Sequence, residues 1–361
     1  MCQNIEQYLI VESGGNMFSL SINQVRNGMT LAQPVFNLNG TKLLEKGHVL
    51  DGKLIVSLKN SGAKRLWVTD DGNMFLKELG PQKIFQEAII ELEYVQTSVL
   101  QGKSFDVNTV NEVAHELVEQ IIYNEMPFAE MIRMKLTENT VLEHMVDVSL
   151  LSIMTAKTLG MDRLDMRFLG FASLLHDVGK MLIPVEILAK PTKLNSTEMR
   201  LIRKHPKIGS DILKNIDGMN KHAVTVALQH HERIDGSGYP NRLIGKHISL
   251  YSKIVAISDI YTAIIREKSY RPRLPVYEAG ELLWAQAGRE LDKDLTFSFL
   301  RNVVAFPLRT SVKLNNGAVG KVVYQNSEFP IRPIVSIEGK MIDLSETPTL
   351  FVAEVLAYEY D

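Results

Sequence analysis

Apolar residues recur at helical spacing along the centre of the chain. Between residues 81 and 100 they fall three or four residues apart, which predicts one long helix. A second helix is predicted over 107–123, before Pro127 ends or redirects the chain. The helical period then continues to about residue 305, without a clear strand alternation. The pattern therefore predicts an all-α centre.

The two ends of the chain carry strand and turn patterns instead. In residues 18–69 glycines interrupt short apolar pairs, Asp51 is placed to cap a helix that runs to Asn60, and 65–68 has strand character. Near the C-terminus apolar runs alternate with two turn signals, Asn315-Asn316-Gly317 and Glu338-Gly339. The predicted fold class is mainly α, with a small mixed α/β N-terminal module and a small antiparallel β C-terminal module.

These changes of pattern predict four successive parts: a mixed module at 17–80, a helical linker at 81–109, a helical domain at 110–305 and a β module at 306–361. Residues 1–16 are either a tail or lie before the true start at Met17, because residues 12–16 can be encoded by a ribosome-binding sequence just before an ATG codon. We expect the β module to be a scaffold cap, since it has no cluster of ligating residues.

Composition excludes several classes of protein. The 361 residues include 40 Lys and Arg against 42 Asp and Glu, a net charge of -2, which argues against general binding to DNA or to an anionic membrane. The single cysteine, Cys2, excludes an intrachain disulfide and a cysteine-based metal site. No apolar run reaches the roughly 18 residues of a membrane span, and the N-terminus lacks a signal-peptide pattern. We expect a cytoplasmic protein that does not insert into membranes.

Five of the nine histidines lie in the helical centre among carboxylates, and these residues are the candidate metal ligands: His144, His176, Asp177, His205, His230, His231 and Asp259. Taken alone, His144 is equally well explained as a hydrogen-bonded core histidine, and His205 is better explained as a surface residue at a helix end. Asp177 and Asp259 differ, because each lies at or within an apolar helix, where a buried carboxylate requires a cation.

The number and type of these ligands indicate two metal ions. Side chains on neighbouring helical positions diverge by about 100°, so His230 and His231 are expected to serve two metals, or one metal and its substrate. Five imidazoles and two carboxylates suit Fe, Mn, Zn or Co better than a thiolate-preferring metal. Two ions about 3.5–4 Å apart, bridged by water or hydroxide, favour phosphate-ester hydrolysis. The ligand set alone also allows an oxygenase.

Two motifs resemble the HD-GYP family, the bacterial phosphodiesterase branch of the HD phosphohydrolases: HDVGK at 176–180 and HHERIDGSGYP at 230–240. The resemblance covers roughly residues 110–305. It implies an HD-domain helical bundle around a dinuclear, sometimes trinuclear, iron or manganese centre that hydrolyses cyclic di-GMP to pGpG and in some cases GMP. By the same resemblance the seven candidates ligate the metals and Asp177 bridges them.

The resemblance also implies contacts with substrate. Lys180 would contact the scissile phosphate or support the nucleophile, so that Asp177 and Lys180 are the expected catalytic residues. Tyr239 would shape the substrate pocket, and Lys268 and Arg271 would hold substrate phosphate and guanine. Segments at each end of the chain also resemble modules that often accompany this domain.

The chain departs from the family pattern at three positions. Thr140 stands where trinuclear members have a glutamate, which favours two metals. Thr262 stands where the family commonly has aspartate, and Lys268 where it usually has arginine, whose guanidinium can make a bidentate contact that an ammonium cannot. Substrate selectivity is therefore less firmly implied than metal binding.

The leading hypothesis is a metal-dependent phosphodiesterase in which a metal-bridging hydroxide attacks cyclic di-GMP. One alternative is a hydrolase of another cyclic dinucleotide or of a nucleotide phosphoester. Another is a slow or non-catalytic cyclic di-GMP sensor that signals through helices in 81–123. A homodimer through the linker helix is a further expectation, and association with cyclic di-GMP synthases follows from family analogy alone.

Overall fold

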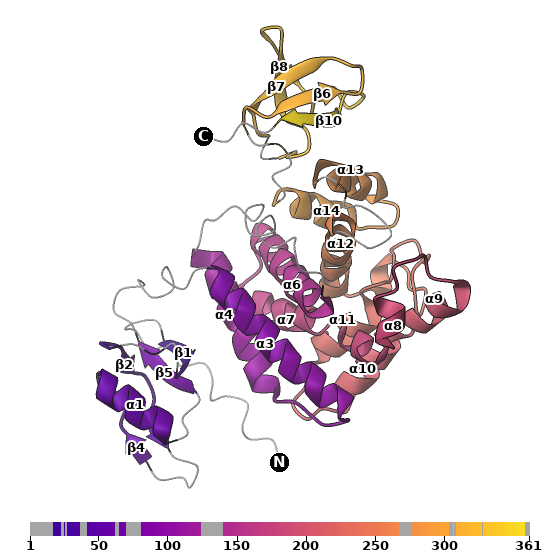
Figure 1. Cartoon of the computed structure of the whole chain (residues 1–361). Helices are drawn as coiled ribbons and strands as arrows, with labels where there is room; N and C mark the ends of the chain where they lie inside the picture. The colour runs from indigo at the N-terminus through magenta and orange to yellow at the C-terminus, as the bar shows by residue number, and fades with distance from the viewer. Residues whose placement is uncertain are drawn as a thin grey trace. The chain divides into compact units, whose positions relative to one another are not determined.

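The chain divides into two compact units, residues 1–80 and 81–361. The computed structural model describes residues 17–22, 25, 27–36, 42–61, 65–69, 81–123, 140–266, 274, 276–302, 306, 308–326 and 328–357 (Figure 1). The segment 1–16 and the predicted substrate contacts Lys268 and Arg271 lie outside the described residues.

The first unit is a small mixed α/β module, as the strand and turn pattern predicts. Its elements are β1 (Met17–Ser21), β2 (Thr30–Leu31), β3 (Val35–Phe36), β4 (Lys42–Leu44), α1 (Gly52–Asn60) and β5 (Arg65–Thr69). An antiparallel sheet has the order β1-β5-β2, and β3 pairs with β4. The carboxylate of Asp51 accepts a hydrogen bond from the backbone N–H of Leu54 at 2.8 Å, so the predicted helix cap is confirmed.

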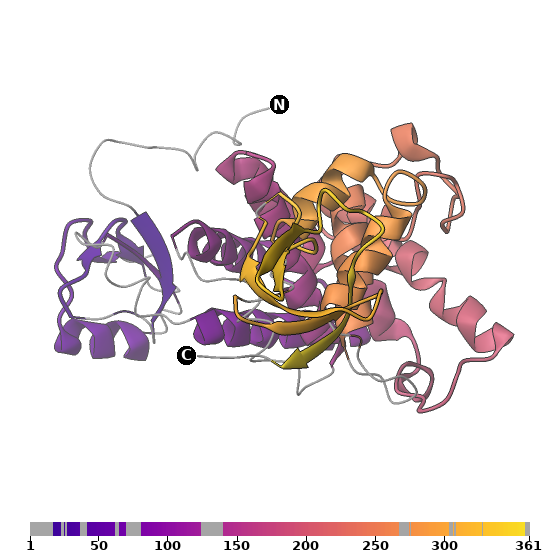
Figure 2. The same ribbon diagram turned by 90° about the horizontal axis from the view of Figure 1, so that it is seen from above.

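The second unit begins with a bundle of helices, seen from two directions in Figures 1 and 2. In chain order its elements are α3 (Pro81–Leu100), α4 (Val107–Tyr123), α6 (Val141–Thr158), α7 (Arg163–Leu174), the 3-10 helix η1 (Val178–Leu182), α8 (Val185–Leu188), α9 (Ser196–Ile202), α10 (His205–Lys214), α11 (Lys221–Gln229), η2 (Gly245–His247), α12 (Leu250–Ile265), α13 (Val276–Gln286) and α14 (Lys293–Leu300). Helix α12 is apolar nearly all round, and most residues of both α6 and α12 are buried in the bundle.

Helix α3 belongs to this bundle and does not behave as the separate linker predicted over 81–109. It packs along α4 and contacts α6 and η1. Its predicted apolar stripe, which includes Ala88, Leu92 and Val95, is buried against them. The helix itself is as predicted; its role differs because an apolar stripe cannot reveal which surface it will cover.

A five-stranded antiparallel sheet closes the chain, which confirms the predicted β module. Its strands are β6 (Ser311–Leu314), β7 (Val319–Tyr324), β8 (Ile334–Ile337), β9 (Lys340–Asp343) and β10 (Val352–Ala357), in the order β10-β6-β7-β8-β9. Both turn signals form hairpins: Gly317 has φ +86°, and Glu338 and Gly339 have φ +49° and +82°. Strand β10 was not predicted, and it pairs with β6.

None of the described helices has both the length and the apolar character that crossing a membrane requires.

Candidate metal centre

All seven candidate ligands converge in the helical bundle. His144 comes from α6, His176 and Asp177 from the turn between α7 and η1, His205 from the start of α10, His230 and His231 from the end of α11, and Asp259 from α12. They form two groups, each with ligand atoms within 4.8 Å of one another: Asp177, His205, His230 and His231, and His144, His176 and Asp259. His144 and Asp259, 115 positions apart in sequence, thus meet in one place, because α12 packs against α6 and α11.

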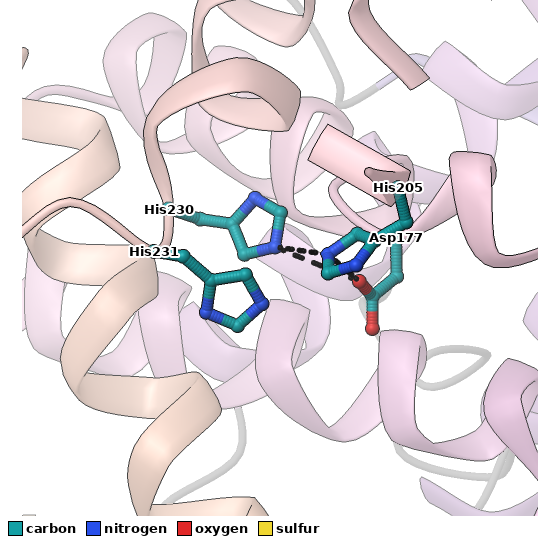
Figure 3. Close-up of side chains that lie close together, drawn as sticks. All are labelled: Asp177, His205, His230 and His231. Carbon is teal, nitrogen blue, oxygen red and sulfur yellow. Dashed lines mark hydrogen bonds and ion pairs between the residues drawn. The ribbon is translucent and has the colours of Figure 1, made fainter. Parts of the chain in front are cut away.

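Asp177 lies between the two groups and is fully buried. Its Oδ1 is 3.2 Å from His205 Nε2 and 3.5 Å from His230 Nε2 (Figure 3). Its Oδ2 is 3.3 Å from His176 Nε2 and 3.6 Å from His144 Nε2. One carboxylate therefore presents a separate oxygen to each set of imidazoles, which is the arrangement a bridging ligand needs.

Three imidazoles are oriented by backbone carbonyls. The Nδ1 atoms of His176, His205 and His230 lie 2.7, 2.8 and 3.0 Å from the carbonyl oxygens of Ser173, Ile202 and Val226. A carbonyl can only accept, so each Nδ1 carries a proton and each ring turns its Nε2 atom toward the centre. This is the tautomer and orientation typical of metal-binding histidines.

Several buried polar atoms at the centre are left without a satisfactory partner. His205 Nε2 and His230 Nε2 face each other at 3.2 Å. Among the described residues, neither His176 Nε2 nor Asp177 Oδ1 has a hydrogen-bond partner. Burying such atoms is costly unless a cation satisfies them. The residues present therefore fit a divalent metal.

The protonation states also suit metal binding. Burial lowers the pKa of His144 and of His230 to about 4, so both rings are neutral near pH 7. Burial alone would raise the pKa of Asp177, but the nearby Lys180 ammonium and the imidazoles outweigh it and hold that pKa well below its usual range. The pKa of Asp259 is held low in the same way, against burial, chiefly by the hydrogen bond with His144.

His230 and His231 do not diverge as expected. Helix α11 ends at Gln229, and the two histidines lie in the turn that follows, with His230 as its C-cap in right-handed helical conformation. Their ring centroids are only 4.2 Å apart, and both belong to the Asp177 group. The expectation of divergent side chains was therefore wrong. His231 Nδ1 is also 3.5 Å from Asp259 Oδ2, so this imidazole lies between the two groups.

The three family departures occupy different environments. Thr140 caps α6: its hydroxyl accepts from the backbone N–H of Glu143, whose side chain accepts in return from the Thr140 N–H. Thr262 is fully buried, and its hydroxyl donates to the carbonyl of Ser258 in the preceding turn of α12. Thr262 thus makes its hydrogen bond within its own helix. The third departure, Lys268, lies outside the described residues.

Sequence reasoning missed an ion pair beside the centre. The guanidinium of Arg266, after the end of α12, donates to Asp147 Oδ2 at 2.5 Å and to the carbonyl of Thr140 at 3.3 Å. Both side chains are buried. Asp147 is one turn along α6 from His144, so the pair fixes α6 against the helix that carries Asp259. An acidic residue one turn from a candidate ligand was the only signal in the sequence.

The glycine-rich loop folds back over the ligand histidines. The backbone N–H of Tyr239 donates to the carbonyl of His231 at 3.2 Å, and the two rings stack with centroids 4.6 Å apart. A Cβ at Gly238 would lie 2.4 Å from the backbone nitrogen of Arg233, so only glycine permits this approach. The loop therefore brings the Tyr239 ring against a candidate ligand, and its role in shaping a substrate pocket stays a prediction.

Glu232 anchors the far side of this loop and was not singled out from the sequence. It is 2% exposed, and its two carboxylate oxygens accept from the backbone N–H groups of Asn241 at 2.7 Å and Leu243 at 2.9 Å. A carboxylate directly after two ligand histidines was the available signal.

We expect Glu232→Gln to lower the free energy of unfolding by about 1.5–3 kcal/mol, because the amide NH2 cannot accept from a backbone N–H and the remaining bond loses its charge. Urea unfolding of the metal-loaded protein measures this change. Glu186→Gln, an exposed glutamate on α8, is the matched control. Equal midpoints for the two variants would contradict the anchoring role.

Comparison with known proteins agrees with this picture. Residues 116–295 match the model of the HD domain, and residues 311–360 match that of a KOW domain associated with the HD domain. The chain is 31% identical over 236 residues to the cyclic di-GMP phosphodiesterase PA4108 of Pseudomonas aeruginosa. This match covers 65% of this chain and 57% of that protein. It is 42% identical over 125 residues to the 3'3'-cGAMP-specific phosphodiesterase 2 of Vibrio cholerae, over 34% of this chain and 24% of that protein. The chain thus spans less than two thirds of either relative.

A solved structure shares the fold. Bd1817, an HDG"Y"P protein from Bdellovibrio bacteriovorus, superposes with a TM-score of 0.53 at 18% identity, over 79% of this chain and 98% of that one. The helical bundle described above is therefore the fold of that structure, and the match to the HD domain covers the segment that carries all seven candidate ligands. As its two motifs predicted, the chain belongs to the HD-GYP branch of the HD domain family.

Proposed function

We propose that this chain is a metal-dependent phosphodiesterase that hydrolyses cyclic di-GMP to pGpG, with GMP as the product of any second cleavage. The observation that carries the proposal is the position of Asp177, a buried carboxylate with one oxygen toward each of two ligand groups. A centre built to hold two cations beside each other is suited to in-line displacement at a phosphodiester. Similarity to cyclic di-GMP phosphodiesterases supports the choice of substrate.

The proposed cofactor is a pair of divalent ions, iron or manganese, held by the seven candidate ligands. Nitrogen and oxygen donors without a thiolate suit these metals. Bound there, they would polarise a phosphoryl oxygen and lower the pKa of a water molecule. Thr140 supports two ions over three, because its hydroxyl is engaged in capping α6.

Lys180 would hold a phosphoryl oxygen of the substrate. Its Nζ lies 2.5 Å from Asp177 Oδ2, and its side chain is still 19% exposed, so it borders the centre. Burial alone would lower the pKa of Lys180, but the carboxylates of Asp177 and Asp259 outweigh it and raise that pKa. The ammonium therefore stays protonated and can donate to an anionic oxygen.

Tyr239 would bind the substrate as a neutral phenol. Burial, with the charges of Asp259 and Asp177, raises the pKa of Tyr239, so its hydroxyl keeps its proton. The phenol can then donate to a phosphate oxygen, and its ring provides an apolar surface beside His231. The proposed contacts by Lys268 and Arg271 rest on the resemblance alone.

A second cyclic dinucleotide is a competing substrate. Similarity to a phosphodiesterase specific for 3'3'-cGAMP favours this alternative, as do the departures at Thr262 and Lys268. A slow cyclic di-GMP sensor is the non-catalytic alternative. A homodimer through α3, association with cyclic di-GMP synthases and a cytoplasmic location remain predictions.

Chromatography of cyclic di-GMP incubated with the purified chain tests the proposal. We expect pGpG to appear after anaerobic loading with iron or manganese, and to disappear when a chelator removes the metal. Cyclic di-AMP and 3'3'-cGAMP in parallel reactions test the alternative substrate. Unchanged cyclic di-GMP in the presence of stoichiometrically bound metal would contradict the proposal, and turnover of 3'3'-cGAMP alone would favour the competing one.

A further inference from the structure

We infer that Arg203 is a specificity-determining residue that binds a pair of hydrogen-bond acceptors of the substrate at the rim of the metal centre. This inference rests on the proposed function, since it concerns the same site. Neither the motifs nor the seven ligands include Arg203, which ends α9 two residues before His205.

Arg203 is connected to the centre through aromatic contacts. Its guanidinium carbon lies 5.2 Å from the centroid of the Tyr239 ring, within the range of a cation–π contact. That ring stacks on His231, whose own ring centroid is 4.9 Å from that of His205. The guanidinium is thus one aromatic ring removed from the candidate ligands, which puts it beside the reacting group without making it a ligand.

The donors of Arg203 are available to a ligand. The residue is exposed, and among the described residues its guanidinium has neither a hydrogen-bond acceptor nor a carboxylate partner. Nearby cations differ: Arg200 donates to the hydroxyl of Thr197, and Lys190 binds Glu198. The contact with Tyr239 restrains the planar group but uses none of its five N–H donors. A restrained, unpaired guanidinium loses little entropy when it binds a ligand.

The chemistry of the guanidinium limits what it can bind. Its fork of parallel N–H donors fits two acceptors side by side, as in a phosphate group or in the N7 and O6 atoms of guanine. Adenine offers N7 as an acceptor but N6 as a donor on the same edge, so it cannot accept both bonds. In a cyclic dinucleotide held by its scissile phosphate at the metals, these acceptors are the other phosphodiester or a guanine base.

Substitution of Arg203 in the full-length, metal-loaded chain tests this inference. For Arg203→Ala we expect the KM for cyclic di-GMP to rise about 10- to 100-fold, with kcat changed much less, since two charge-assisted hydrogen bonds are lost. Arg203→Lys keeps the charge but not the fork and should recover only part of this loss. Arg200→Ala, on the same helix, is the matched control and should leave KM unchanged. Metal content and melting temperature should match the wild type in all three variants.

Equilibrium binding separates the two sources of acceptors. The probes are phosphorothioate analogues of cyclic di-GMP and cyclic di-AMP, which resist hydrolysis. If Arg203 binds phosphate, Arg203→Ala weakens both analogues by the same factor. If it reads guanine, only the cyclic di-GMP analogue is weakened. Unchanged dissociation constants and an unchanged KM would overturn the inference.

The two proposals fail in different ways. If the wild type hydrolyses none of the cyclic dinucleotides, the proposed function fails, whereas the binding measurement still reports on Arg203. If the wild type hydrolyses cyclic di-GMP and Arg203→Ala behaves like Arg200→Ala in both assays, only the role of Arg203 fails.

Discussion

Replacing Asp177 with asparagine should lower the rate of cyclic di-GMP hydrolysis by about 10²- to 10⁴-fold. The substitution preserves volume but removes a charge from a fully buried position between two groups of imidazoles. Removing one partner of a buried ionic cluster costs about 3–5 kcal/mol, and each 1.36 kcal/mol is about tenfold in rate or affinity. An asparagine has only one side-chain oxygen. It could therefore offer a metal-binding oxygen to one of the two ligand groups but not to both.

Metal content and turnover together measure this effect. We expect Asp177→Asn to bind less metal than the wild type and to form pGpG about 10²- to 10⁴-fold more slowly. Asp211→Asn provides the matched control, because Asp211 is an exposed aspartate on α10 whose carboxylate pairs with Lys207 in its own helix. A variant at Asp177 that kept both full metal content and turnover would show that this carboxylate does not bridge.

The same variant distinguishes an enzyme from a sensor. A cellular role that depends on hydrolysis is lost with Asp177→Asn, whereas a role that depends only on binding cyclic di-GMP survives if the substrate still binds. The binding assay with the phosphorothioate analogue therefore belongs beside the turnover assay. Loss of turnover with an intact cellular role would favour the sensor.

Local signals in the sequence predicted most elements of the fold. Asp51 caps α1, and Asn195 with Glu198 forms a capping box at the start of α9, and these interactions involve residues only three positions apart. The fold class and the family follow from such local patterns and from the two motifs. The packing of α3 and the pairing of β10 with β6 depend on distant partners, which periodicity does not identify.

In the candidate site, too, the sequence indicates which residues take part but not which distant partners they contact. Asp177 and Asp259 were singled out because carboxylates are unusual at or within apolar helices, whereas His205 was proposed as a ligand only together with the other histidines and through the family resemblance. The close approach of the His230 and His231 rings was not predicted, because it depends on side-chain contacts such as that of His230 Nδ1 with the carbonyl of Val226. Glu232 and Arg203 were missed because their partners are backbone N–H groups and the face of a tyrosine, neither of which leaves a pattern in sequence.

Gly179→Ala should destabilise the fold and weaken metal binding, because η1 approaches α10 closely at this glycine. A Cβ at Gly179 would lie 2.1 Å from the carbonyl oxygen of His205 and 2.6 Å from the backbone nitrogen of Gly209. Both neighbours are backbone atoms, so no side-chain rotation can relieve the clash. The turn that carries Asp177 must therefore shift away from α10, which carries His205. We expect a loss of about 3 kcal/mol in the free energy of unfolding, and metal affinity lower by about 10- to 100-fold, as for residues that orient metal ligands.

A graded series of alanine variants tests this packing even if Gly179→Ala fails to fold. At Gly209 the added Cβ would lie 3.1 Å from the backbone nitrogen of Gly179, a tight contact, whereas at Gly245 it would lie 3.4 Å from Ile234 Cβ, an ordinary one. Melting temperature and bound metal should therefore fall most for Gly179→Ala, less for Gly209→Ala and least for Gly245→Ala. Because η1 and α10 hold Asp177 and His205, the loss of metal should follow the loss of stability along this series. If Gly179→Ala matched Gly245→Ala in both measurements, backbone contact between η1 and α10 would not be what holds these two ligands together.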